Sequence, residues 1–279
     1  MTLKDVLVVK DLWWPFGAHL LHTKWAYIYS IMNGYDFFYK YNHFPVFNGT
    51  INHYFECIGI SEDELINKNQ IEFVPHTNPY LRGRFCPKEY NNVEDFHSDI
   101  LKKIYKPNHF VKEYLNKNSL LNKVKDTKYI CVHIRLGDKV NGPDIQTVII
   151  PLQNYFDKCK EVKDQTGINT IVVCSDTSDG LTEFISLDTN NEFEILFNDE
   201  YRSRNDWNDS IVTKVYRGFN DKEFLETEYL NCFVNFELLL KSEIIIANLD
   251  SGFCIVPVEI RNNKKDINVN TTSLWGIKH

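Results

Sequence analysis

The chain has 279 residues, which at roughly 150 residues per domain corresponds to two domains or one large one. Hydrophobic residues make up 43% and charged residues 25%, so the composition excludes a collagen-like, low-complexity or wholly disordered chain. The 31 basic and 38 acidic residues leave a net charge of −7, which argues against a general nucleic-acid binder. One anion held in a local basic pocket is compatible with this charge.

No apolar stretch approaches the ~20 residues that a transmembrane helix needs, and the N-terminus lacks the pattern of a signal peptide. We therefore expect a cytoplasmic protein, with a trimmed lumenal domain of the Golgi type as the weaker alternative. The seven cysteines are scattered and include no Cys-x-x-Cys pair. This pattern favours buried free thiols over a disulfide framework.

The beginning of the chain predicts a strand, a helix and a second strand. The β-branched run at 6–9 is typical of a short strand. Apolar residues at helical spacing predict a helix over 19–32, and Gly34 is placed to cap its C-terminus. A second strand is expected at 35–39.

The middle of the chain is less regular. Residues 50–90 are rich in His, Asn and Pro, which indicates loops with short helices. Helices are expected over 93–105 and 111–123, with Pro107 at the break between them because proline suits a helix start and not a helix interior.

Strands and helices alternate in the second half. Continuous apolar runs, typical of strands buried on both faces, are each followed by a helical pattern. The predicted strands cover 129–134, 170–174, 193–197 and 243–247, and the predicted helices cover 151–162, 181–185, 226–241 and 255–261. This alternation indicates an α/β fold with a doubly wound, Rossmann-like parallel sheet. We expect an N-terminal α/β domain over 1–124 and the Rossmann-like domain over 125–279.

Polar clusters follow three of these strands, and ligands of parallel sheets bind beyond the carboxyl ends of the strands. The clusters cover 133–139, 175–177 and 248–252. The planar, permanently charged guanidinium of Arg135 suits a phosphate, and Ser251 opens a helix whose N-terminus attracts anions. Together the clusters predict a site for an anionic, nucleotide-like ligand.

Several phosphate and metal motifs are absent from the sequence. There is no G-x-G-x-x-G after the first strand, no G-x-x-x-x-G-K-[ST], and no Asp-x-Asp pair that would hold Mg²⁺ or Mn²⁺ on a sugar nucleotide. This disfavours a P-loop kinase or phosphatase and a dinucleotide enzyme. It predicts a pocket without metal, in which Arg and Lys neutralise phosphates.

Residues 133–140, His-Ile-Arg-Leu-Gly-Asp-Lys-Val, resemble the His-x-Arg-Arg-x-Asp-Lys-Val motif of the core α1,6-fucosyltransferases and their bacterial nodulation relatives. The second and third motifs of this superfamily resemble residues 171–177 and 247–254. Its N-terminal glycine-rich turn resembles residues 16–22, and the helix before its first motif resembles residues 107–114. The motifs occur in the order of the fucosyltransferase-like superfamily.

The resemblance implies a two-domain glycosyltransferase of the GT-B type, with the acceptor on the N-terminal domain and the nucleotide sugar on the C-terminal one. It also implies an inverting transfer without metal, and no cofactor besides the nucleotide-sugar co-substrate. His133 would contact the base or ribose, Arg135 would bind the diphosphate, and Lys139 would assist near the β-phosphate. The donor-binding set that the motifs imply is Gly17, His133, Arg135, Ser175, Asp176, Asn235, Asp250, Ser251 and Gly252.

Several positions depart from the family pattern. Leu136 stands in place of the second Arg of the first motif, and Asp250 in place of the first Ser of the third. Asn235 aligns with an Asp that helps to recognise guanine; since Asn has one acceptor oxygen and its NH₂ would face a donor, uracil becomes a competing base. The family's catalytic Glu falls on Pro143, and the adjacent Asp144 is the candidate that takes the acceptor hydroxyl proton, with a solvated loop Asp as the competing interpretation.

The residues and the resemblance together predict an inverting, metal-independent glycosyltransferase that moves a sugar from a nucleoside-diphosphate sugar, GDP-fucose by family default, to a hydroxyl of a glycan acceptor. Asp144, Arg135 and Lys139 are the candidate catalytic residues. Further candidates are His76, His97 and His109 for the base, and Trp13 and Trp14 for stacking on the acceptor. One alternative is a UDP-sugar donor such as UDP-xylose, and an alternative of another class is an inactive nucleotide- or carbohydrate-binding module. The expected partners are the nucleotide sugar and the glycan, and no nucleic acid.

Overall fold

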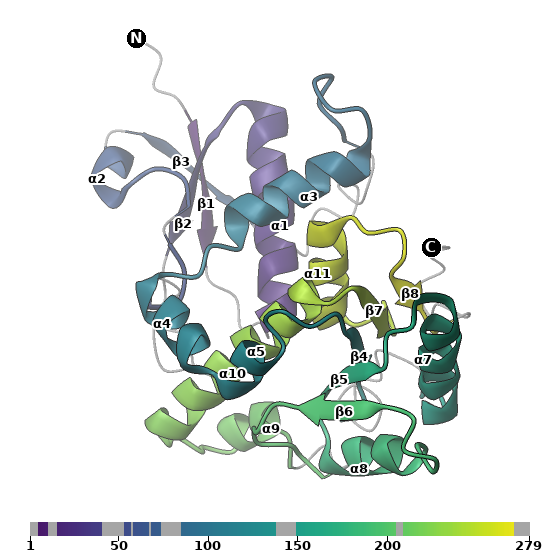
Figure 1. Ribbon diagram of the computed structural model, residues 1–279. Coiled ribbons are helices and arrows are strands. Elements are labelled where there is room, and N and C mark those ends of the chain that lie inside the picture. The colour runs from purple at the N-terminus through teal and green to yellow at the C-terminus, as the bar shows by residue number, and fades with distance from the viewer. Residues whose placement is uncertain are drawn as a thin grey trace. The chain divides into compact units, whose positions relative to one another are not determined.

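The computed structural model describes residues 5–10, 16–40, 53–56, 58–66, 68–73, 85–137, 149–204 and 209–270. Their contacts divide the chain into two compact units, whose elements are labelled in Figure 1. The first unit contains the residues up to Glu113 together with Glu259–Asn262. The second contains Tyr114–Val258 and the residues from Asn263 onward.

The first unit contains a three-stranded parallel sheet in the order β2-β1-β3. Strand β1 (Asp5–Lys10) pairs with β2 (Asp36–Lys40) on one side and with β3 (Asn69–Phe73) on the other. Helix α1 (Phe16–Asn33) is the crossover between β1 and β2, and helix α3 (Val93–Ile104) packs against it. The predicted strands and the predicted first helix of this half are therefore confirmed.

Local signals set the ends of helices in the first unit. Helix α1 ends before Gly34, whose φ of +67° lies in the left-handed region that favours glycine, as the sequence predicts. The short helix α2 (Glu62–Leu65) begins with a capping box, in which the Ser61 hydroxyl and the Glu64 carboxylate accept each other's backbone N–H.

Two segments differ from the prediction. The expectation of loops and short helices over 50–90 is wrong for β3, an edge strand in which only the last residue is buried, because such a strand lacks a continuous apolar run. The single helix expected over 111–123 is two helices, α4 (His109–Lys117) and α5 (Ser119–Lys123). They separate at Asn118, whose side chain accepts a backbone N–H of α5 at 2.9 Å and caps that helix.

The second unit contains a five-stranded parallel sheet in the order β6-β5-β4-β7-β8. Its strands are β4 (Ile130–Ile134), β5 (Thr170–Ser175), β6 (Glu194–Phe197), β7 (Ile244–Ala247) and β8 (Ile267–Asn268). Its further helices are α7 (Leu152–Thr166), α8 (Ser178–Ser186), α9 (Ile211–Tyr216), α10 (Lys222–Lys241) and α11 (Gly252–Arg261), the last of which ends in the first unit. The predicted α/β class with a Rossmann-like parallel sheet is confirmed.

Helices cover both faces of this sheet. On one face Val132 packs in a core with Phe156 of α7 and Phe184 of α8. On the other face Cys131 packs in a second core with Leu238 of α10. Successive residues of β4 therefore enter opposite cores, and each large apolar side chain buried there stabilises the fold by roughly 1.5–3 kcal/mol. This double burial explains the continuous apolar run of the strand.

The contacts place the junction of the two compact units between Glu113 and Tyr114. Leu120 and Leu121 of α5 pack in the same core as α10, so the second unit begins at Tyr114. The division into an acceptor-side domain over 1–124 and a nucleotide-binding domain over 125–279 stays a prediction.

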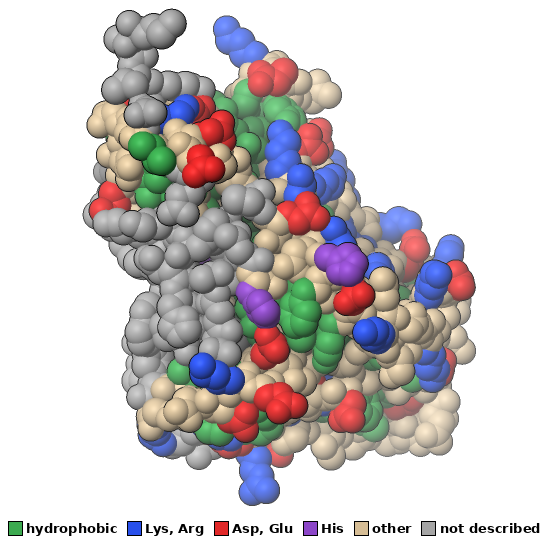
Figure 2. All heavy atoms as spheres, turned by 90° about the vertical axis from the view of Figure 1, so that its left-hand side faces the viewer, with side chains coloured by type: hydrophobic (Ala, Val, Ile, Leu, Met, Phe, Trp, Pro, Cys, Tyr) green, Lys and Arg blue, Asp and Glu red, His purple; other side chains and the backbone are tan. Residues whose placement is uncertain are grey.

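In the described part of the chain no helix is long and apolar enough to cross a bilayer, and the cytoplasmic location stays a prediction. The described cysteines are all free, as expected, although Cys86 and Cys232 are only partly buried. Cys57 lies outside the described residues. On the face shown in Figure 2, basic and acidic side chains of the described residues are interspersed and form no basic patch.

Candidate functional site

The candidate site lies at the carboxyl edge of the five-stranded sheet. The chain passes from β4 outward through β5 to β6 and then crosses back, so that β7 lies on the other side of β4. The strand order reverses between β4 and β7, and ligands of open parallel sheets bind at such a switch point. The predicted polar clusters begin at or directly after the ends of β4, β5 and β7, so they share this edge.

Arg135 and Asp176 form an ion pair at this edge. Arg135 Nη1 lies 2.8 Å from Asp176 Oδ2, and the two side chains are 24% and 19% exposed. The same carboxylate accepts the backbone N–H groups of Leu136 at 2.9 Å and Gly137 at 3.0 Å. Asp176 therefore fixes the loop that follows β4 and holds the guanidinium of Arg135.

The surroundings of Asp176 are tightly packed. A Cβ atom on Gly137 would lie 2.6 Å from Asp176 Oδ2. Ser203, from the loop after β6, donates its backbone N–H and its hydroxyl to the Asp176 carbonyl, each at 3.1 Å. The buried Ser175 hydroxyl donates to the Thr177 carbonyl at 3.0 Å and accepts the Thr177 N–H at 3.2 Å. The turn after β5 is thus held by its own side chains.

His133 is a buried, neutral imidazole. Its ring stacks on Phe253 with the ring centroids 5.4 Å apart. Burial, helped by the charge of Arg135, lowers the pKa of His133 to about 3. Among the described residues its Nδ1 has no hydrogen-bond partner. A neutral imidazole of this kind is suited to hydrogen-bonding a base or ribose and is not a general acid at neutral pH.

The turn between β7 and α11 carries the third polar cluster. Asn248 Oδ1 accepts the N–H of Asp250 at 3.1 Å, and the Asp250 carboxylate accepts Asn270 Nδ2 at 2.6 Å. Ser251 and Gly252 are half-buried at the start of the helix. The positive end of the helix dipole at this position stabilises an anion. The acidic Asp250 is held by the amide of a residue that follows β8.

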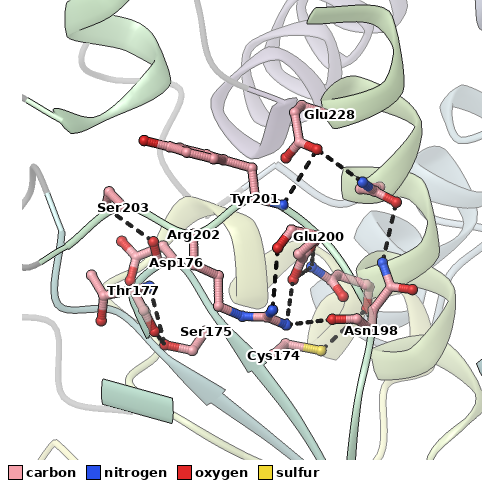
Figure 3. Close-up of polar contacts among 12 residues, drawn as sticks. Cys174, Ser175, Asp176, Thr177, Asn198, Glu200, Tyr201, Arg202, Ser203 and Glu228 are labelled. Atoms are coloured by element: carbon pink, nitrogen blue, oxygen red, sulfur yellow. Dashed lines mark hydrogen bonds and ion pairs between the residues drawn. The ribbon is translucent and has the colours of Figure 1, made fainter. Parts of the chain in front are cut away.

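A buried polar network joins the loop after β6 to α10 (Figure 3). Asn235 Nδ2 lies 2.8 and 2.7 Å from the two carboxylate oxygens of Glu200. Arg202 Nη2 lies 3.1 Å from Glu200 Oε1 and donates to the Asn198 carbonyl at 2.6 Å. Burial raises the pKa of Glu200 to about 7, although the Arg202 charge and the Asn235 hydrogen bonds act in the opposite direction.

The network continues along α10. Glu228 Oε1 accepts Asn231 Nδ2 at 3.1 Å and the backbone N–H of Tyr201 at 3.4 Å. Asn231 Oδ1 accepts Asn198 Nδ2 at 3.2 Å and the Tyr114 hydroxyl at 3.1 Å. Burial also raises the pKa of Glu228. Two carboxyl groups thus lie in one buried amide-rich network.

The sequence analysis missed Glu200, Arg202 and Glu228. A signal was present for the first two, since the polar run Asn-Asp-Glu-Tyr-Arg directly follows a predicted strand, as the other three clusters do. Nothing in the spacing of α10 distinguishes Glu228 from a solvated glutamate. Its partners come from the loop after β6 and from the helix itself.

The remaining predicted residues belong to the first unit or fall outside the described residues. Gly17 is buried in the first turn of α1, in the first unit. His97 is buried against the Trp25 ring, and burial lowers its pKa to about 4, whereas His109 is exposed on α4. Outside the described residues are Lys139, Asp144, His76, Trp13 and Trp14. Among the described side chains, no group of three His, Cys, Asp or Glu could hold a metal ion.

The chain matches no protein-family model and no curated protein sequence. Its structure is similar to that of NodZ alpha-1,6-fucosyltransferase soaked with GDP-fucose, with a TM-score of 0.56 and 9% identity over 92% of each chain. Fucosyltransferase NodZ from Bradyrhizobium has a TM-score of 0.53 and 11% identity over 92% of each chain. POFUT1 in complex with GDP-fucose has a TM-score of 0.50 and 8% identity over 96% of this chain and 97% of its own.

These structural similarities extend over nearly the whole length of both chains. At 8–11% identity they show a common fold. They agree with the fold class that the resemblance of residues 133–140 implied. The chain therefore has the GT-B-type fold of the fucosyltransferases NodZ and POFUT1.

Proposed function

We propose that the chain is a glycosyltransferase that moves a sugar from a nucleoside-diphosphate sugar to a hydroxyl of a glycan acceptor. The observation that carries the proposal is the position of Arg135, held by Asp176 at the switch point of a sheet whose fold is shared with NodZ and POFUT1. The NodZ crystal was soaked with GDP-fucose, and the POFUT1 structure is a complex with GDP-fucose. A guanidinium that follows β4 and a helix N-terminus that follows the neighbouring strand β7 suit a diphosphate.

In this proposal the donor lies along the carboxyl edge of the sheet. Arg135 and the start of α11, with Ser251 and Gly252, bind the diphosphate. His133 contacts the base or ribose with its neutral ring, and Asn235 contacts the base. The acidic Asp250 belongs to the same donor site and is kept from the phosphates by its bond to Asn270. Asp176 and Ser175 hold the two loops in place.

One donor-site residue and two catalytic residues are carried over from the sequence analysis. Gly17 is assigned to donor binding, and Lys139 assists near the β-phosphate. Asp144 takes the proton of the acceptor hydroxyl.

The proposed reaction is a single displacement. The deprotonated acceptor oxygen forms a bond to the anomeric carbon, and the bond from that carbon to the β-phosphate oxygen breaks on the opposite face. The configuration therefore inverts, and the nucleoside diphosphate leaves with additional negative charge. Arg135 and Lys139 stabilise that charge without a metal, and a preorganised cation at a leaving group is among the largest catalytic contributions.

GDP-fucose is the donor that the proposal favours, because the fold is shared with enzymes whose crystals were prepared with it. A UDP-sugar such as UDP-xylose is the second candidate. The observation that favours it is the amide of Asn235, which stands where the resembling family has a carboxylate.

A thermal-shift screen tests the binding part of the proposal. The chain is melted with GDP, UDP, ADP and CMP and with their sugar conjugates, with and without Mn²⁺. A nucleotide at about 100 times its Kd stabilises the folded state by roughly 2.7 kcal/mol. We expect GDP and GDP-fucose to raise the melting temperature without Mn²⁺, and we expect Arg135→Ala to lose this shift.

The matched control is Arg217→Ala, which removes an exposed arginine at the end of α9 that belongs to none of the site loops. It should keep the full shift. A shift with UDP alone would select the UDP-sugar donor. Binding without release of nucleoside diphosphate from any sugar conjugate would favour the inactive module, and no shift with any nucleotide would contradict the proposal.

A further inference from the structure

The direction of the Asn235 amide is set by Glu200. An ionised carboxylate only accepts hydrogen bonds, so the atom of Asn235 that faces it must be the donor Nδ2. Nδ2 lies within 2.8 Å of both carboxylate oxygens, so one of its N–H groups points between them. The amide oxygen therefore points away from Glu200.

The amide oxygen is the part of Asn235 that is left for a ligand. Oδ1 is buried, and no donor among the described residues reaches it. A buried acceptor without a partner costs free energy, so native structures usually supply one. Asn235 lies next to the last residues of β5, because its backbone carbonyl accepts the Cys174 thiol at 3.9 Å, and its side chain contacts Glu200 in the loop after β6. This places it at the edge of the sheet where the donor is proposed to bind.

We propose that Glu200 is a specificity-determining residue, which fixes Asn235 as a pure acceptor and thereby selects guanine over uracil in the nucleotide donor. The inference rests on the proposed function, because it needs a nucleotide at this edge. The residue acts through Asn235 and is a positioning residue. The charge of Arg202, 3.1 Å from Glu200 Oε1, favours the ionised carboxylate against the burial that raises its pKa.

The chemistry of the two bases gives the direction of the preference. The edge of guanine offers two adjacent donors, the N1–H and the exocyclic NH₂, and both can approach one acceptor oxygen. Uracil offers a single N3–H between two carbonyl oxygens. A freely rotating Asn would bind uracil with both of its atoms, accepting the N3–H and donating to a carbonyl. With Nδ2 held by Glu200, the second of these bonds is lost, and the uracil carbonyls face no donor.

In this arrangement Asn235 does not present its NH₂ to the donors of guanine. The NH₂ is turned toward a neighbouring carboxylate, so the atom of Asn235 that is left for the base is its acceptor Oδ1. The pair of Glu200 and Asn235 thus presents an acceptor to guanine, as an aspartate at position 235 would. Neither residue is sufficient alone.

The test compares the affinities for GDP and UDP in four forms of the full chain by isothermal titration. Glu200→Gln removes the charge that orients Asn235. The double variant E200Q/N235D exchanges the carboxylate and the amide, so that the amide introduced on the loop donates to the carboxylate introduced on α10 and the net charge of the pair is kept. The matched control is Glu228→Gln, which removes the other buried carboxylate of the network, a group that bonds Asn231 and not Asn235.

We expect the wild type to prefer GDP and the preference to fall by roughly tenfold to hundredfold in E200Q, the range for one well-formed base contact. The exchange variant should recover the wild-type ratio to within about twofold, and E228Q should keep it to the same limit. A ratio that is unchanged in E200Q, or equally reduced in E228Q, would overturn the inference while leaving the proposed function intact. A wild type that binds neither nucleotide would overturn both.

Discussion

Replacing Gly137 by alanine tests how the loop after β4 holds Arg135. The added Cβ would lie 2.6 Å from Asp176 Oδ2 and 3.3 Å from Asp176 Cγ. Both distances are shorter than ordinary carbon contacts, so one side must move. Asp176 cannot move freely, because its carboxylate is bound by Arg135 and by the N–H groups of Leu136 and Gly137.

The size of the effect follows from these contacts. Overpacking of a well-filled site costs about 1–3 kcal/mol. Each hydrogen bond to a charged group contributes about 1.5–3 kcal/mol, and we expect the equivalent of one of the two amide bonds to be lost. The unfolding free energy should therefore fall by about 2.5–6 kcal/mol. The guanidinium of Arg135 loses its fixed partner in the same step, so GDP binding should weaken as well.

Urea unfolding gives the stability change, and titration with GDP under native conditions gives the affinity change. The control is Gly34→Ala, where a Cβ meets no atom within 4 Å and the cost comes only from the φ of +67°. That variant should lose about 1 kcal/mol of stability and keep the wild-type affinity. If Gly137→Ala were as stable as the wild type and bound GDP equally well, the role given to the Asp176 cluster would be refuted.

Two further predictions concern buried charges. Burial raises the pKa of Glu200 from its usual 4.5 to about 7, so between these values the folded chain keeps a proton that the unfolded chain has lost, and the unfolding free energy falls as pH rises. We expect melting curves from pH 4.5 to 8 to show a flatter dependence for Glu200→Gln than for the wild type, and parallel curves would contradict the assignment. In the first unit, Lys24 is fully buried and lies 2.6 Å from the Glu259 carboxylate, which is 26% exposed. Glu259→Gln should cost about 3–5 kcal/mol in denaturant titrations because it leaves a buried cation unpaired, and Lys24→Met should cost less. The exposed pair of Lys158 and Glu161 provides the control, since Glu161→Gln should change stability by less than about 1 kcal/mol.

The sequence predicted the second half of the chain well because burial on both faces leaves an unmistakable pattern. The apolar runs of β4, β5 and β7 need no tertiary information to be recognised, and the polar residues after them mark one edge of the sheet. Strand β3 escaped detection because an edge strand with one buried residue looks like a loop. Strand β8 escaped detection because two residues are too few to show a period.

The sequence indicated that the polar clusters share one edge of the sheet, but not the bonds among them. The spacing placed Arg135 and Asp176 at one edge, yet their ion pair depends on the packing of two loops. The pairing of Glu200 with Asn235 joins residues 35 positions apart, which no local pattern can indicate. Because the sequence does not show this pairing, the NH₂ of Asn235 was expected to face a donor of guanine. Uracil was therefore a competing base.

Release of GDP from GDP-fucose is the measurement that tests the central claim most directly. The wild-type chain and Arg135→Ala are incubated with GDP-fucose, with and without a mixture of glycan acceptors, and free GDP is followed over time. We expect the wild type to release GDP, faster with a suitable acceptor, and we expect Arg135→Ala to be slower by the factor that corresponds to about 2–4 kcal/mol of lost transition-state stabilisation. Equal rates in the two forms would contradict the role of Arg135, and no release from GDP-fucose or any UDP-sugar would contradict the proposed glycosyltransferase.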